Sequence, residues 1–143
     1  MAIVNTSFRA FANKLPKVIS PRQHAIIDYA TAGAFALGAV LFWKNHKRAA
    51  IASLACGAAE AGTAMMTDFP GGLWKVIPLE THGKIDAGLA AGLEAIPTLL
   101  AFGDDPRAWF FRSQGLSIAA VTGMTKFNTG PRRSESRKRQ KIA

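Results

Sequence analysis

The sequence predicts an all-α protein: a four-helix transmembrane bundle built from two parallel two-helix repeats, plus a short N-terminal amphipathic helix. Three observations predict this fold. Four apolar runs each approach the length of about 20 residues that a bilayer-spanning helix requires. The connectors between these runs are polar or rich in Gly and Pro. A His-x-x-x-Asp pattern opens both the first and the third run.

Length and charge agree with one small membrane domain. A chain of 143 residues suits a single domain, and its 18 Lys and Arg gather in the two ends and the connectors, which leaves the middle strongly apolar. The single Cys56 excludes an intrachain disulfide and is interpreted as a small buried hydrophobe.

Residues 1–19 form an amphipathic pattern in which apolar residues alternate with basic ones at roughly helical spacing. Pro16 should end this helix after Leu15. We expect the helix to lie on the membrane surface with its basic side toward anionic headgroups. Packing on a soluble core explains this stretch equally well.

The first two spans follow, at residues 24–43 and 49–67. Ser20, Pro21 and Gln23 predict a helix start, with Ser20 as the N-cap and Gln23 completing a capping box. The second span is interrupted by one charged residue, Glu60.

The third and fourth spans are expected at residues 82–102 and 107–125, after a turn-rich connector. Thr81 is the expected N-cap of the third span, and Pro97 is expected to kink it. Arg112 is the charged residue inside the fourth span.

Residues 24–72 align without a gap onto residues 82–130. The informative matches are the His and Asp at the start, and Met66-Thr67-x-Phe69 against Met124-Thr125-x-Phe127 at the end. We therefore expect a membrane domain at 20–130, made of repeats at 20–72 and 78–130. Two spans return the chain to its starting side, so the copies should be parallel, with a pseudo-twofold axis along the membrane normal.

Charge predicts the orientation of the bundle. Lys and Arg are most frequent in residues 1–22 and 126–143, which places both termini in the cytoplasm. Trp43 and Trp109 then fall at the opposite interface, where aromatic residues are enriched. The basic tail at 131–143 is expected to be disordered and held to anionic lipid, and nucleic-acid binding is disfavoured because no aromatic residue is interleaved in it.

One family resemblance accompanies these patterns. The His-x-x-x-Asp helix start, Thr-Asp-Phe-Pro at 67–70, Ile-Pro at 77–78 and His-Gly-x-Ile-Asp at 82–86 resemble small, functionally uncharacterised bacterial membrane proteins. These are similar to the SPW (Ser-Pro-Trp) repeat family, whose unit is also a two-helix membrane hairpin. The resemblance covers roughly residues 20–105, and it implies a bacterial inner-membrane setting without supplying an activity.

The two His-Asp pairs, His24 with Asp28 and His82 with Asp86, should lie at one depth on the cytoplasmic side. In one interpretation they only favour helix starts, where the dipole stabilises carboxylates. In the other they converge on a divalent metal site or a proton-binding cluster. The spacing alone leaves metal binding undecided.

Further charged residues lie inside the expected spans. Glu94 and Arg112 should reach similar depths and form a structural ion pair. Glu60 lies about one turn deeper than the Asp level, so it should accept a hydrogen bond from a His or Lys84, remain protonated, or join the His/Asp cluster as an ion ligand.

The sequence contains no nucleophile and base pattern, phosphate loop or Cys/His metal motif, so we expect no enzyme and no cofactor. The leading hypothesis is a structural or accessory membrane bundle. The alternatives are an ion or proton translocator using Asp28, Asp86 and Glu60, with homo-oligomerisation left open, and a soluble basic protein that binds nucleic acid.

Overall fold

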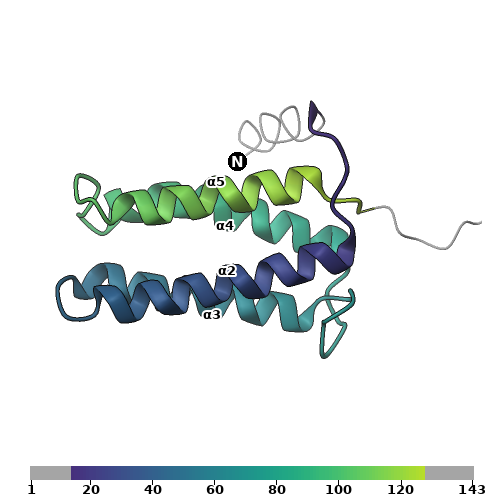
Figure 1. Cartoon of the computed structure of the whole chain (residues 1–143), viewed down its shortest axis with the longest axis horizontal. Coiled ribbons are helices and arrows are strands. Elements are labelled where there is room, and N and C mark those ends of the chain that lie inside the picture. The colour runs from purple at the N-terminus through teal and green to yellow at the C-terminus, as the bar shows by residue number, and fades with distance from the viewer. Residues whose placement is uncertain (1–13, 128–143) are drawn as a thin grey trace, which may run out of the picture.

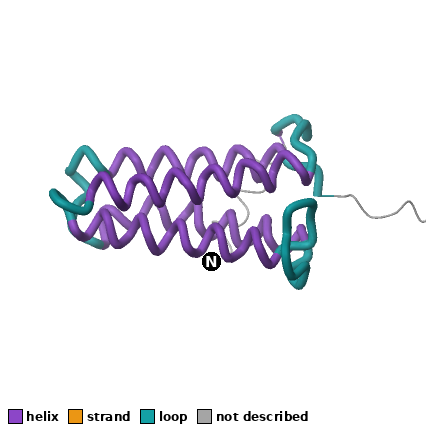
Figure 2. The backbone as a smooth tube through the Cα atoms, turned by 60° about the horizontal axis from the view of Figure 1, so that its bottom comes forward, coloured by secondary structure: helices purple, strands orange, loops and turns teal. Residues whose placement is uncertain are grey.

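The computed structural model describes residues 14–127, and this part of the chain holds four helices and no strand. Helices α2 (Pro21–Phe42) and α3 (Lys47–Met66) form one hairpin, and α4 (Leu79–Leu99) and α5 (Ala108–Met124) form another. The connectors inside the two hairpins lie at one end of the bundle (Figures 1 and 2). The α3–α4 connector lies at the other end, together with the entry to α2 and the exit from α5 (Figure 1). The predicted all-α class is confirmed.

The start of α2 has the predicted chemistry. The Ser20 side chain accepts a hydrogen bond from the Gln23 backbone N–H, and the Gln23 side chain accepts one from the Ser20 N–H, which completes the capping box. Helix α3 uses His46 as its N-cap, because Nδ1 of that ring accepts the Ala49 N–H.

The expected start of α4 at Thr81 is wrong. Pro78 is the N-cap, and its carbonyl accepts the N–H groups of both Thr81 and His82. The first helical turn therefore closes three residues earlier than expected, and Thr81 lies within it. Pro97 lies near the opposite end of the same helix, two residues before its last residue, Leu99.

Close helix contact inside each hairpin depends on glycine. A Cβ placed on Gly57 would lie 2.9 Å from Phe35 Cβ, and one on Gly115 would lie 2.9 Å from the Ala90 carbonyl oxygen. Both residues thus permit two backbones to approach. The core beside them is aromatic, with Phe35 and Phe111 both fully buried.

Two segments predicted from the sequence lie mainly outside residues 14–127. Residues 1–13 of the amphipathic helix and residues 128–143, which include the basic tail, lie outside the described residues. Two helices, α2 and α3, are long and apolar enough to cross a membrane, a criterion of length and composition that a core helix of a soluble protein also meets.

Candidate functional site

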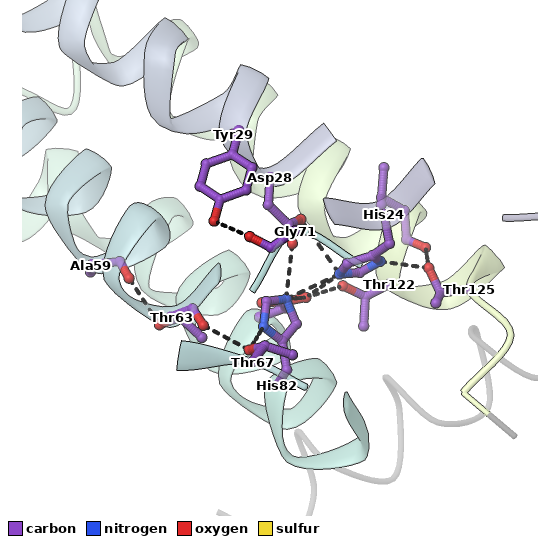
Figure 3. A network of polar contacts seen from close by, with 12 residues as sticks. His24, Asp28, Tyr29, Ala59, Thr63, Thr67, Gly71, His82, Thr122 and Thr125 are labelled. Carbon is purple, nitrogen blue, oxygen red and sulfur yellow. Dashed lines mark hydrogen bonds and ion pairs between the residues drawn. The ribbon is translucent and has the colours of Figure 1, made fainter. Parts of the chain in front are cut away.

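Four ionisable side chains converge at the end of the bundle where the chain enters α2. They are His24, Asp28, His82 and Asp86, here called the His/Asp cluster. Figure 3 labels the first three of them. Each is at most 3% exposed. The i to i+4 spacing puts each Asp on the same helical face as its His, one turn further along. The structure therefore brings together the two pairs that the sequence singled out.

The two imidazole rings face each other through Nε2. The Nε2 atoms of His24 and His82 are 3.1 Å apart, and the rings meet nearly edge to face. Asp86 Oδ2 lies 3.2 Å from each of these nitrogens. Asp28 approaches from its own side, with Oδ1 3.4 Å from His24 Nε2 and Oδ2 3.2 Å from His82 Nε2. Each nitrogen thus contacts both carboxylates.

The Nδ1 side of each ring is held by a threonine. Thr125 Oγ1 lies 2.7 Å from His24 Nδ1 and Thr67 Oγ1 lies 2.7 Å from His82 Nδ1. Each threonine comes from the other hairpin, so the contacts cross the bundle. Both hydroxyls already donate their single proton to a backbone carbonyl, that of Val121 or Thr63. The threonine oxygens must therefore accept, and both His rings carry their proton on Nδ1.

A short backbone pairing positions each of these threonines. Ile19 pairs with Thr125, and Ile77 pairs with Thr67, each as an isolated parallel bridge. The Ile19 N–H donates to the Met124 carbonyl at 3.1 Å, and the Ile77 N–H donates to the Met66 carbonyl at 2.9 Å. The segment before each His helix thus fixes the end of the helix that carries the threonine.

Aromatic rings close the outer side of the cluster. Phe69 lies 5.4 Å from His82 between ring centroids, and Phe127 lies 6.2 Å from His24. Phe127 also fills the space next to Gly83, where an added Cβ would lie 2.6 Å from its ring. Both His side chains beside these rings are fully buried, and polar contacts are stronger in such low-dielectric surroundings.

Glu60 lies deeper along the bundle beside the cluster. It is 3% exposed, and it lines a cavity of about 10 Å³ together with Asp28 and Asp86. That is about the space of one water molecule. Two threonines line the same cavity, and Thr122 donates to Asp86 Oδ2 at 3.1 Å. Lys84 is exposed and forms no ion pair with Glu60 in the described part of the chain.

The structure does not bring Glu94 and Arg112 together as expected. Among residues 14–127 no ion pair joins them, and Arg112 Nη2 instead donates to the Gly103 carbonyl at 3.3 Å. This carbonyl lies in the connector that begins where α4 ends, so the guanidinium of Arg112 contacts the local backbone instead of Glu94. In the same connector the pKa of Asp105 is lowered, first by the hydrogen bond from the Arg107 backbone N–H and then by the hydrogen bond and charge of the Arg107 guanidinium.

The sequence did not point to three threonines that contact the His/Asp cluster, Thr67, Thr122 and Thr125. A signal existed for two of them, because Thr67 and Thr125 are matched positions of the internal alignment. Their contact with a His depends on cross-bundle packing that spacing does not reveal.

Comparisons with protein-family models, curated proteins and solved structures find no match for this chain.

Proposed function

We propose that this chain is a four-span integral membrane protein made of two parallel hairpin repeats, and that it acts as a structural or accessory bundle whose His/Asp cluster joins the two hairpins. In line with the resemblance to the SPW repeat family, we place it in a bacterial inner membrane with both termini in the cytoplasm. Lipid is then its main partner.

The observation that carries the membrane proposal is an inverted distribution of polarity. Asp28, Glu60 and Asp86 are at most 3% exposed, whereas Val40 is 72% and Leu99 is 77% exposed. Buried carboxylates together with a large exposed apolar surface are the opposite of what water favours. Large apolar side chains point outward from all four helices, at Ile26, Leu37, Val40, Leu41, Ile51, Leu54, Ile85, Leu99, Trp109 and Leu116.

Matched contacts support the repeat. At the offset of the internal alignment, Ile19 corresponds to Ile77 and Thr67 corresponds to Thr125. The bridge between Ile19 and Thr125 is therefore the counterpart of the bridge between Ile77 and Thr67. The same shift converts the Gly57 contact with Phe35 into the Gly115 contact with Leu93. A pseudo-twofold axis between the hairpins accounts for both pairs.

Packing supports the joining role of the cluster. Most helix contacts lie within a hairpin, α2 on α3 and α4 on α5, and far fewer lie between the hairpins. The His to Thr and His to Asp contacts cross that sparse interface (Figure 3). Buried polar contacts between membrane helices add to packing where no water competes.

An ion or proton translocator is the second candidate. The cavity beside Asp28, Asp86 and Glu60 favours it, because carboxylates around a water-sized space inside a membrane bundle are typical of proton relays.

Membrane integration is tested by alkaline carbonate extraction of the full chain. Retention in the pellet supports the proposal, and release without detergent refutes it. In a Cys56→Ala background, Asn45→Cys in the exposed α2–α3 connector should react with an impermeant maleimide in intact cells. Ala2→Cys and Ala143→Cys should react only after permeabilisation, and the reverse pattern refutes the orientation.

The double variant Asp28→Asn, Asp86→Asn separates the two candidate functions. Normal assembly with loss of a wild-type ion or proton flux in vesicles would refute the structural role. If the wild type carries no ion or proton flux and the double variant fails to assemble, the translocator hypothesis would be refuted.

A further inference from the structure

We propose that the His/Asp cluster is a binding site for a divalent transition metal ion of the zinc type, held by His24, His82 and Asp86 with Asp28 as the fourth ligand. The inference rests on the proposed function in one respect, since the same cluster joins the two hairpins. The proposal goes further by naming a metal ion that the His/Asp cluster binds.

The protons of both His rings lie on Nδ1, away from the centre of the cluster. With Nδ1–H of each ring donated to a threonine, a neutral His24 and a neutral His82 both present an Nε2 lone pair to the centre of the cluster. The carboxylates of Asp28 and Asp86 also present lone pairs there. A centre lined by acceptors from four buried side chains needs a cation.

Protons satisfy this centre only in part. Two N–H groups cannot point at each other across the 3.1 Å between the Nε2 atoms, so at most one proton occupies that contact. Asp28 Oδ2 is buried and accepts no hydrogen bond from the described residues, because its 3.2 Å contact with His82 Nε2 lacks hydrogen-bond geometry. A buried oxygen without a hydrogen-bond partner destabilises the fold, and a metal ion provides the partner that Asp28 Oδ2 lacks.

The distances between the ligand atoms are close to those of a tetrahedral zinc site. Tetrahedral zinc binds His nitrogen and carboxylate oxygen at about 2.0–2.2 Å, which separates neighbouring ligand atoms by about 3.3–3.6 Å. The triangle of His24 Nε2, His82 Nε2 and Asp86 Oδ2 has edges of 3.1, 3.2 and 3.2 Å. An ion above this triangle reaches all three atoms after a change of a few tenths of an ångström, and Asp28 lies against the edge formed by the two nitrogens.

The threonines around the cluster also favour a metal site. Metal-bound His usually donates its other N–H to a fixed acceptor, and metal-bound carboxylates are themselves hydrogen-bonded. Thr125 and Thr67 accept from the two rings, and Thr122 donates to Asp86 Oδ2. Two imidazoles with two carboxylates suit zinc better than magnesium or calcium, which prefer oxygen ligands alone.

The test uses the full-length protein in mild detergent, stripped with a chelator and titrated with Co²⁺ and then Zn²⁺. The expected result is one Co²⁺ per chain with the visible absorption of tetrahedral cobalt, displaced by Zn²⁺. His82→Gln and Asp86→Asn should abolish this absorption. His46→Gln is the matched control and should bind as the wild type does, because His46 lies near Asp105 at the other end of the bundle.

Two measurements keep the test decisive if a ligand variant fails to fold. Thr67→Val and Thr125→Val retain all four ligands and should weaken Zn²⁺ binding by about 10- to 100-fold. X-ray absorption of the wild-type zinc protein should show nitrogen and oxygen ligands only, which excludes Cys56 as a ligand.

Absence of binding by the folded wild type, or equal binding by His82→Gln and the wild type, would overturn the metal site. The joining role would survive that result if His82→Gln still lowered the stability of the metal-free protein. Release by carbonate would refute the membrane proposal without affecting the metal titration.

Discussion

Replacing Thr67 with Val tests how the histidines are held. Valine has nearly the shape of threonine but no hydroxyl, so the change removes the acceptor 2.7 Å from His82 Nδ1 and leaves a buried N–H without a partner. Such a group costs about 1–3 kcal/mol. His82 has no measurable exposure, so water cannot replace the lost acceptor and the upper half of that range is expected.

The assay is reversible unfolding of the metal-free protein in detergent, followed by circular dichroism. The matched control is Thr63→Val, one turn earlier on α3, where the hydroxyl donates only to the Ala59 carbonyl in a more exposed setting. The control should change the free energy of unfolding by less than about 0.5 kcal/mol. Equal losses in the two variants would show that the Thr67 contact with His82 contributes no specific stability.

Two further predictions concern packing and the α4–α5 connector. Gly57→Ala should destabilise the bundle by about 1–3 kcal/mol because the new Cβ would lie 2.9 Å from Phe35 Cβ. Gly62→Ala on the same helix meets nothing within 4 Å and should be neutral or stabilising in the same unfolding assay, so equal effects would contradict the close approach at Gly57. The pKa of Asp105 is lowered, so its contribution to stability is present above the unfolded pKa of about 3.9 and is lost as pH falls through the folded pKa. Arg107→Gln keeps the backbone N–H, which is the largest single cause of the lowered pKa. NMR titration should therefore show the pKa of Asp105 rising only part of the way toward its ordinary value, and a full return would contradict that assignment.

Local signals predicted the helices well. Ser20, Pro21 and Gln23 act within one turn, so their capping box was readable from the sequence and is present in the structure. The start of α4 was harder to predict. Thr81 has good capping chemistry, but the carbonyl of Pro78 captures the first helical N–H groups and starts the helix earlier.

Long-range polar contacts were less predictable. Depth in the membrane predicts a pair between Glu94 and Arg112, but depth alone does not reveal the nearby Gly103 carbonyl to which Arg112 donates. The repeat symmetry predicts only that the two His-Asp pairs lie at one depth. Whether they converge stays open at the level of sequence, because the distance between the rings depends on how two hairpins pack.

The sequence by itself determined which segments are helical and that a His and an Asp recur on one face of two helices, because both follow from local periodicity. Only the tertiary structure decided what these side chains contact. Thr125 is 101 residues from His24 in the chain, yet its hydroxyl holds Nδ1 of that ring and turns the Nε2 lone pair toward the other three members of the cluster. That orientation depends on packing between two hairpins, which no local pattern encodes.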